Sequence, residues 1–370
     1  MGHGQKTIHP KRTNELGQPW MGGGQKITHN QHNQKQGKII SHRFESNVLK
    51  SNPLKDPYTR DLTIYLPPEY SKSNSEGYTA VFCLVGYGGT GKMLLNVDPF
   101  SETIEDRMNR LISEKKCGPL VLVLVDCFTR FGGSQYINSS ATGMYEDYIV
   151  KEIVPFIDKN YNVSRHAVMG HSSGGYGALV LGMHHPDTFQ AVADHSGDSA
   201  FEYCYLPDFP KALDVFRRAE GDPKKWLEEF WQKPNKYQDG KDMAALSIFG
   251  MAAHYSPNPQ SEYFGVDFPF DLESGEIKQE VWNRWLSLDP VRMMEKYHDN
   301  LKKLKLIYID CGTEDEFNML WGCRMIHSKL DRMGIPHYYE EFPDGHRRIS
   351  YRYDVSLPMV YHSLSATARG

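Results

Sequence analysis

Short, continuously apolar runs alternate along this chain with stretches that carry apolar residues at helical spacing, and this alternation constrains the fold most. A run that is apolar throughout is typical of a strand buried on both faces. Such strands, alternating with helices, predict the α/β class: a mostly parallel central sheet with helices on both faces. Strands are expected at residues 61–66, 79–85, 120–125, 167–169, 191–193, 304–309 and 337–342.

Three stretches between these runs are predicted to be helices. Residues 145–157 repeat isoleucine and valine at helical spacing, and residues 173–184 are rich in glycine, alanine and leucine. Residues 319–333 place leucine, methionine and isoleucine on one side. The chain therefore alternates strand and helix over most of its length.

Residues 199–290 interrupt the alternation. Four tryptophans stand there among many tyrosine, phenylalanine and proline residues, and strand-like runs are scarce. We expect a helical and loop insertion that forms a cap, within an α/β domain spanning residues 39–370. Packing inside the cap is the favoured role of the tryptophans, and stacking on an aromatic or sugar-bearing ester is the alternative.

Residues 1–38 differ from the rest of the chain in composition. They are rich in glycine, glutamine, asparagine, histidine and lysine, and show almost no apolar periodicity. This composition predicts a flexible N-terminal arm. A solvated tail is favoured over a metal site at its four histidines, which are His3, His9, His29 and His32.

Charge and apolar content exclude several classes of protein. The 370 residues include 42 Lys+Arg and 46 Asp+Glu, a formal net charge of −4, without the basic excess of a nucleic-acid binder. The apolar run at residues 120–125 is far shorter than the roughly 20 residues of a membrane helix. Residues 1–30 lack the apolar core of a secretory signal, so a cytoplasmic location is expected.

The six cysteines show no C-x-x-C spacing, which argues against a zinc ribbon or a thioredoxin motif. Buried thiols are favoured over disulfides. Neither a cofactor nor a metal ion is expected, and the oligomeric state stays open.

One motif carries chemistry: Gly170-His171-Ser172-Ser173-Gly174, a G-x-S-x-G sequence. A short apolar run precedes it and a helical stretch follows, which is the strand–turn–helix setting of a nucleophile elbow. The turn is so tight that the positions two before and two after the nucleophile must be nearly free of side chain, as Gly170 and Gly174 are. Ser172 is therefore the predicted nucleophile.

A serine nucleophile needs a base and a carboxylate, which follow it in the chain order Ser, Asp or Glu, His. After the strand at 304–309, Asp315 lies in the loop before the next helix. It is preferred over its neighbours Glu314 and Glu316, although an acid at a helix start can simply cap the helix. Asp310 closes the strand and is expected to serve local structure.

The predicted base is His346, in the sequence Pro343-Asp-Gly-His346 after the last strand. His337 begins that strand, at the wrong edge of the sheet, and His327 falls in the middle of a helix. The carboxyl ends of parallel strands meet at one edge, so His346 is expected near Ser172 and Asp315.

Two backbone N–H groups are expected to bind a developing oxyanion. One belongs to Ser173, at the start of the helix, and the other to Tyr87, in the glycine-rich loop after residue 85. The same loop partly matches a phosphate-binding motif, but Met93 stands where that motif needs serine or threonine.

Together these segments resemble the putative-esterase family of α/β hydrolases, which includes enterochelin esterases, feruloyl esterases, S-formylglutathione hydrolases and mycolyl transferases. The resemblance covers about residues 40–360 and implies an α/β-hydrolase fold. The spacing Gly312-x-x-Asp315-x-Phe317 is similar to the family's acid loop, and Glu146 is implied to support the site from behind. Many members have His-Gly before the oxyanion loop, where this chain has Val85-Gly86. The segments that carry the resemblance are residues 61–68, 84–89, 143–148, 170–175, 312–317 and 344–346.

The expected function is a serine hydrolase that cleaves small carboxylic esters through an acyl-enzyme intermediate. An acyltransferase with the same three residues is an alternative, because an alcohol can replace water in the second step. A non-catalytic binding module on the same fold is a further alternative. The identity of the ester is left open.

Overall fold

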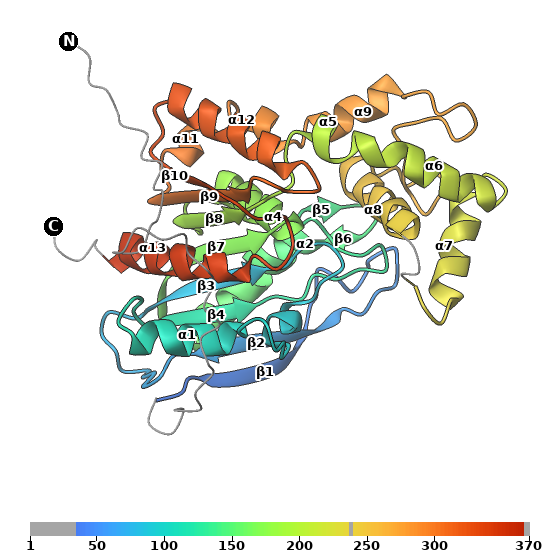
Figure 1. Ribbon diagram of the computed structural model, residues 1–370. Coiled ribbons are helices and arrows are strands. Elements are labelled where there is room, and N and C mark those ends of the chain that lie inside the picture. Colours follow the sequence, from blue (N-terminus) through green and yellow to red (C-terminus); the bar gives the residue numbers. More distant parts are fainter. Residues whose placement is uncertain (1–34, 237–239, 366–370) are drawn as a thin grey trace, which may run out of the picture. The chain divides into compact units, whose positions relative to one another are not determined.

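The computed structural model describes residues 35–236 and 240–365. An eight-stranded sheet forms the centre of this part of the chain, in the order β1-β2-β4-β3-β7-β8-β9-β10 (Figure 1). β2 pairs antiparallel with β1 and β4, and every other neighbouring pair is parallel. The predicted mostly parallel sheet is confirmed. Its strands are Lys38–Glu45 (β1), Thr59–Leu66 (β2), Tyr78–Leu84 (β3), Leu120–Leu124 (β4), Val163–His171 (β7), Ala191–His195 (β8), Leu306–Gly312 (β9) and Tyr338–Phe342 (β10).

Helices cover both faces of the sheet. Successive residues of β3 alternate between two separate cores: Phe82 packs in the core beneath α3, α4 and α12, whereas Val81 and Cys83 pack against α1 and α13. Each parallel strand is thus buried on both sides, which explains the continuously apolar runs. The helices are Ile104–Ser113 (α1), Val154–Asn160 (α3), Ser173–His184 (α4), Met319–Arg332 (α12) and Tyr353–Ser365 (α13).

The segment between β8 and β9 is mainly helical, and Figure 1 shows its longer helices gathered at one side of the sheet. Its tryptophans pack on other aromatic rings: Trp285 is fully buried, and its ring centroid lies 5.8 Å from that of Phe209. The helices are Phe201–Cys204 (α5), Leu206–Asp208 (η4), Phe209–Arg218 (α6), Pro223–Gln232 (α7), Gly240–Tyr255 (α8), Gln279–Leu286 (α9), Pro290–Met293 (α10) and His298–Leu301 (α11).

The remaining elements are short. The predicted helix at residues 145–157 consists of α2 (Tyr145–Asp147), a π-helical stretch η3 (Tyr148–Ile153) and α3. The others are η2 (Gly91–Leu95), η5 (Ser350–Arg352) and a two-stranded pairing of β5 (Asn138–Ser139) with β6 (Gly143–Met144).

Two further observations bear on the sequence analysis. All six cysteines are buried and free of disulfides, as expected. Within the described residues, no helix combines the length and apolar character that crossing a bilayer needs. Residues 1–34 of the predicted arm lie outside the described residues, and the domain limits stay predictions.

Candidate active site

The turn from β7 into α4 gives Ser172 an unusual backbone conformation. Its φ is 58° and its ψ is −126°, a region that non-glycine residues rarely adopt. Strain of this kind persists only where the surrounding structure enforces it. It turns the chain sharply between strand and helix and leaves Ser172 partly exposed at the carboxyl edge of the sheet.

Two glycines make this turn possible. A Cβ on Gly170 would lie 2.3 Å from the backbone carbonyl carbon of Gly174, and a Cβ on Gly174 would lie 2.5 Å from the carbonyl oxygen of Leu84. Both distances are far below any tolerable contact, so neither position has room for a side chain. The G-x-S-x-G pattern is thus a steric requirement of the turn.

Asp315 and His346 meet at the same edge of the sheet. The Nδ1 atom of His346 lies 2.6 Å from Oδ2 of Asp315, and both residues are largely buried. The other carboxylate oxygen, Oδ1, accepts the N–H groups of Phe317 and Met319 at the start of α12, at 2.9 and 3.2 Å. One oxygen therefore holds the helix start, and the other holds the imidazole.

The charge on Asp315 sets the tautomer of His346. Burial by itself raises the pKa of Asp315, but the hydrogen bond and charge of His346 and the N–H groups of Met319 and Phe317 hold this pKa below its ordinary value. The carboxylate is ionised at neutral pH and accepts a hydrogen bond, so the proton of a neutral His346 belongs on Nδ1. Nε2 then carries the lone pair that a general base needs.

Contacts with His171 and Glu316 fix the position of His346. The N–H of His346 donates to Oε2 of Glu316 at 2.7 Å, and its carbonyl accepts from Nε2 of His171 at 2.9 Å. The ring centroids of His171 and His346 lie 4.6 Å apart, and the Phe317 ring approaches edge-on at 4.8 Å. These contacts place His346 beside the residue that precedes Ser172.

Ser172 itself makes no side-chain hydrogen bond within residues 35–236 and 240–365, to His346 or to any other group. Such contacts are often long in free enzymes and tighten when substrate binds.

Burial, reinforced by the charge of His346, lowers the pKa of His171 to about 3. His171 is therefore neutral at neutral pH and can donate its hydrogen bond to the His346 carbonyl without adding charge.

The sequence analysis missed the roles of His171 and Glu316. His171 occupies a variable position of G-x-S-x-G, and Glu316 entered only as an alternative acid. Both act through the backbone of His346, a contact between loops far apart in sequence. The sole available signal was their position next to predicted catalytic residues.

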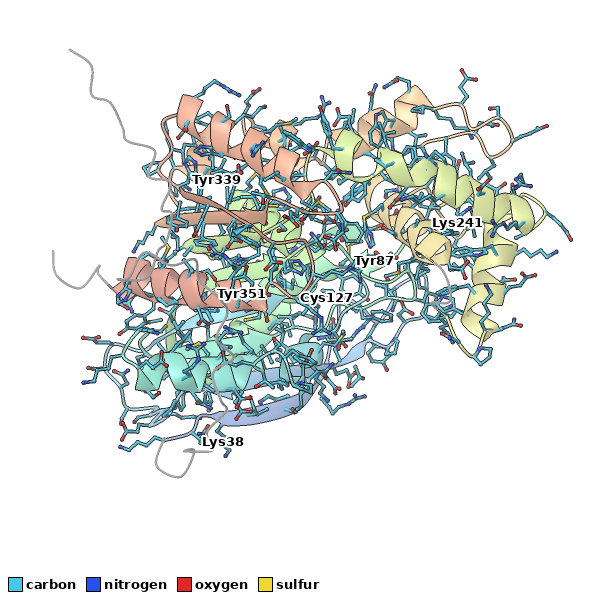
Figure 2. The ribbon with its side chains drawn as sticks, in the orientation of Figure 1. Lys38, Tyr87, Cys127, Lys241, Tyr339 and Tyr351 are labelled. Atoms are coloured by element: carbon cyan, nitrogen blue, oxygen red, sulfur yellow. The ribbon has the colours of Figure 1, made fainter. Side chains whose placement is uncertain are left out.

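The glycine-rich loop after β3 lies against the nucleophile. A Cβ on Gly86 would come within 3.2 Å of the Ser172 Cβ. The phenol oxygen of Tyr87 lies within hydrogen-bond distance of the carbonyls of Phe131 and, at 2.8 Å, of Leu246 in α8 (Figure 2). The loop that carries the Tyr87 N–H is thereby connected to the insertion.

The base of this loop has a partner that the sequence did not indicate. The hydroxyl of Tyr136 donates to the carbonyl of Val85 at 2.6 Å and accepts its N–H at 2.8 Å. Ser173 is the first residue of α4, so its N–H has no partner within the helix. The Ser173 hydroxyl donates to Asp198 at 3.0 Å, so this side chain is engaged in a contact within the protein.

The structure does not bring Glu146 to this site, which corrects the expectation that it supports the site. Its Oε1 atom accepts hydrogen bonds from His184 and His185, at 3.0 and 2.7 Å, at the far end of α4. His184 is twelve residues after Ser172, about 18 Å along the helix. The resemblance placed Glu146 near the site, but α4 carries its partners to the opposite edge of the sheet.

A second Ser–His–Asp arrangement lies inside the core. Nδ1 of His195 is 2.7 Å from Asp310, Nε2 of His195 is 2.9 Å from the Ser356 hydroxyl, and all three residues are fully buried. Asp310 also accepts from Tyr308 at 2.6 Å and from Arg352 at 2.8 Å. As expected, Asp310 serves local structure.

Solved structures share this fold. A ferulic acid esterase matches with a TM-score of 0.57 and 19% identity over 89% of this chain and 99% of its own. The serine hydrolase FphF of Staphylococcus aureus gives 0.52 and 15%, over 88% and 98%. An S-formylglutathione hydrolase from Agrobacterium tumefaciens gives 0.51 and 16%, over 89% and 96%. The molecule is therefore an α/β hydrolase in fold.

Sequence comparison gives the family. Residues 57–358 match the family described as "Putative esterase", and this chain belongs to it. Esterase MT1326 and Esterase Rv1288, both of Mycobacterium tuberculosis, are each 23% identical over 325 residues, which cover 85% of this chain. The match spans only 57% of the length of these two curated relatives.

Proposed function

We propose that this protein hydrolyses carboxylic esters through an acyl-enzyme intermediate, with Ser172 as the nucleophile. In this proposal His346 is the general base and Asp315 holds its imidazole. The observation that carries the proposal is the hydrogen bond of 2.6 Å between His346 and Asp315, beside a serine held at positive φ. Membership of the esterase family supports it.

The chemistry follows from the geometry. Nε2 of His346 takes the proton of the Ser172 hydroxyl as its oxygen attacks the ester carbonyl, and then returns it to the leaving alcohol. The Asp315 carboxylate stabilises the imidazolium that forms in between. Water, activated by the same base, releases the acid from Ser172 and restores the enzyme.

The N–H groups of Tyr87 and Ser173 are proposed to bind the tetrahedral oxyanion. The approach of the Gly86 loop to Ser172 and the helix start at Ser173 support this assignment. Each such donor contributes about 3 kcal/mol to stabilising the transition state. No side chain is needed for either contact.

The test compares Ser172→Ala with the unmodified full-length chain on p-nitrophenyl acetate, p-nitrophenyl butyrate and methyl ferulate. We expect kcat to fall by a factor on the order of 10⁵–10⁶ in the variant. A fluorophosphonate probe should label the unmodified chain and fail to label Ser172→Ala.

Ser356→Ala is the matched control, because Ser356 contacts a histidine–aspartate pair but is fully buried. Its labelling should be unchanged. Full turnover by Ser172→Ala would contradict the proposal, as would failure of the probe to label the unmodified chain. Product analysis of the p-nitrophenyl butyrate reaction with added methanol distinguishes hydrolysis from acyl transfer, since a transferase forms mainly methyl butyrate and a hydrolase mainly butyrate.

A further inference from the structure

Two histidines and an aspartate form a cluster at the edge of the sheet opposite the candidate active site. His327 and Asp331 lie one turn apart on α12, and His337 directly precedes β10. One ligand atom from each residue can be chosen so that all three lie within 4.8 Å of one another. We propose that this cluster binds a divalent transition-metal ion of the Zn²⁺ type, independently of the esterase chemistry.

The distances fit a site that closes around an ion with small movements. Nδ1 of His327 lies 2.7 Å from Nε2 of His337, and the Asp331 carboxylate lies 3.6 Å from Nε2 of His327 and 4.0 Å from Nε2 of His337. Ligand atoms about 2.0–2.1 Å from a tetrahedral ion stand roughly 3.3 Å apart. Nδ1 of His327 now faces His337 and Nε2 faces Asp331, and only one of these nitrogens can bind the ion. The hydrogen bond between the rings must therefore break, and the Asp331 carboxylate must approach them.

The buried histidine is already arranged as a ligand. Nδ1 of His337 donates to the carbonyl of Ile335 at 2.9 Å, so its proton sits there and its Nε2 lone pair faces His327. A hydrogen bond from the second ring nitrogen to a backbone carbonyl is the usual support of a metal-bound histidine. It fixes both the tautomer and the ring orientation.

The other ring is held as well. The His327 ring stacks on Tyr339, with centroids 4.3 Å apart and an interplanar angle of 8°. This stacking holds the His327 ring beside His337 and Asp331.

The ligand types select the class of ion. Two imidazoles and one carboxylate suit Zn²⁺, Co²⁺, Ni²⁺ or Cu²⁺, whereas Ca²⁺ and Mg²⁺ prefer oxygen ligands alone. The His327 and Asp331 side chains are 37% and 63% exposed, so an ion can enter from solvent and keep a water as fourth ligand. The ion would tie α12 to the beginning of β10.

The cluster of Glu146, His184 and His185 is a weaker candidate. There both histidines are hydrogen-bonded to one carboxylate oxygen, at 3.0 and 2.7 Å, so each polar group facing the centre already has a partner. In the proposed site one hydrogen bond joins the two rings, from Nδ1 of His327 to Nε2 of His337, and an ion would have to replace it. The Asp331 carboxylate has no hydrogen bond to either ring and is available to an ion.

The test titrates the metal-free full-length chain with Zn²⁺ by calorimetry, and with Co²⁺ by visible absorption. His327→Ala is the main variant, because the side chain is 37% exposed and its removal loses the stacking on Tyr339 but no fully buried packing. His337→Ala is the second variant, and Glu146→Gln is the matched control at the other cluster. All four proteins keep the histidines of residues 1–34, and circular dichroism checks their folding.

We expect the unmodified chain and Glu146→Gln to bind Zn²⁺ alike and to show the same Co²⁺ bands. His327→Ala and His337→Ala should each bind one Zn²⁺ fewer per chain, or bind it at least about tenfold more weakly, and lose the corresponding Co²⁺ band. Equal binding by a folded His327→Ala would overturn the proposal. Loss of Zn²⁺ binding in Glu146→Gln would place the ion at the cluster of Glu146, His184 and His185, and would also overturn the proposal.

Discussion

At the scale of single residues, Asp315 performs two tasks with its two oxygens. Oδ1 accepts the N–H groups at the start of α12, and Oδ2 accepts from His346. Helix capping and imidazole orientation, posed as alternatives from the sequence, are thus compatible. An amide at this position can perform the first task but not the second.

Asp315→Asn should therefore separate activity from stability. We expect kcat for p-nitrophenyl acetate to fall by about 10⁴, because an amide can donate to Nδ1 and favour the wrong tautomer. The oxygen of asparagine still accepts at the helix start, so thermal unfolding should change little. Glu316→Gln, which keeps an acceptor for the His346 N–H, is the control and should remain within about tenfold of the unmodified chain. A variant that loses both folding and activity would refute this division.

Gly170→Ala tests the steric argument for the nucleophile turn. The added methyl group meets the backbone of Gly174 at 2.3 Å, so we expect a loss of about 3 kcal/mol in the free energy of unfolding, together with activity. Gly240→Ala is the control, because a Cβ at Gly240 meets no described residue within 4 Å. Urea unfolding measures both, and equal stability of the two variants would show that the turn relaxes.

The positions that chain order and local turn geometry determine could be predicted from the sequence. Ser172 follows from the two glycines, and Asp315 and His346 from their places after two strands. The roles of His171 and Glu316 depend on loops that meet only in the folded chain. Glu146 was misplaced because nothing local shows that its partners sit at the far end of α4.

At the scale of elements, the Glu146 carboxylate joins α2 to the end of α4. Burial by itself raises the pKa of Glu146, but hydrogen bonds from His184 and His185 outweigh it and lower the pKa to about 2. The folded chain therefore holds the ionised form more strongly than the unfolded chain does. This contribution to stability is complete above about pH 4.5 and disappears as the pH falls towards 2.

Glu146→Gln should lose about 1–3 kcal/mol of unfolding free energy at pH 7 and keep its esterase activity. The difference from the unmodified chain should shrink as the pH falls from 4.5 to 2. Urea unfolding at several pH values, with turnover of p-nitrophenyl acetate at pH 7, provides the measurement. A large loss of kcat in a variant that stays stable would show that Glu146 does support the active site.

Most of the interior parallel strands were predictable because burial on both faces makes them apolar throughout. β1 was not expected: its exposure alternates along Lys38–Glu45, and it pairs antiparallel at the edge of the sheet. β9 extends through Gly312, beyond the apolar run, because Asp310 is satisfied by buried partners. Because its last residues are not apolar, the full length of this strand was not predicted from the sequence.

At the scale of the whole molecule, three buried groups with large pKa shifts contribute to the pH dependence of stability. Burial raises the pKa of Asp194 to about 8, with Asp310 and Asp198 adding to the effect and the N–H of Gly197 opposing it. Burial also lowers the pKa of His171 and of His254 to about 3. The folded chain thus keeps all three groups neutral over much of the working range.

Because the histidines and Asp194 change the stability in opposite directions as the pH rises, these contributions predict a pH of maximum stability. Between pH 3 and 6.5 the unfolded chain binds more protons at the two histidines than the folded chain does, so stability rises with pH despite the opposite slope from Asp194. Of these three contributions, only that of Asp194 still changes between pH 6.5 and 8. There the folded chain keeps a proton that the unfolded chain has released. Stability then falls, by at most about 1.4 kcal/mol per pH unit.

Asp194→Asn should remove the fall between pH 6.5 and 8 and leave the rise below pH 6.5. Urea unfolding from pH 4 to 8.5 measures both limbs. A fall that persists unchanged in the variant would show that another group causes it.

The buried trio of Ser356, His195 and Asp310 has a practical consequence for finding enzymes by shape. A search for a serine, a histidine and an aspartate in hydrogen-bonding geometry would return this buried trio. It would rank the trio above Ser172, His346 and Asp315, because Ser356 is hydrogen-bonded to its histidine and Ser172 is not. Solvent access, which Ser172 has and Ser356 lacks, is therefore the criterion that separates the proposed nucleophile from the buried serine.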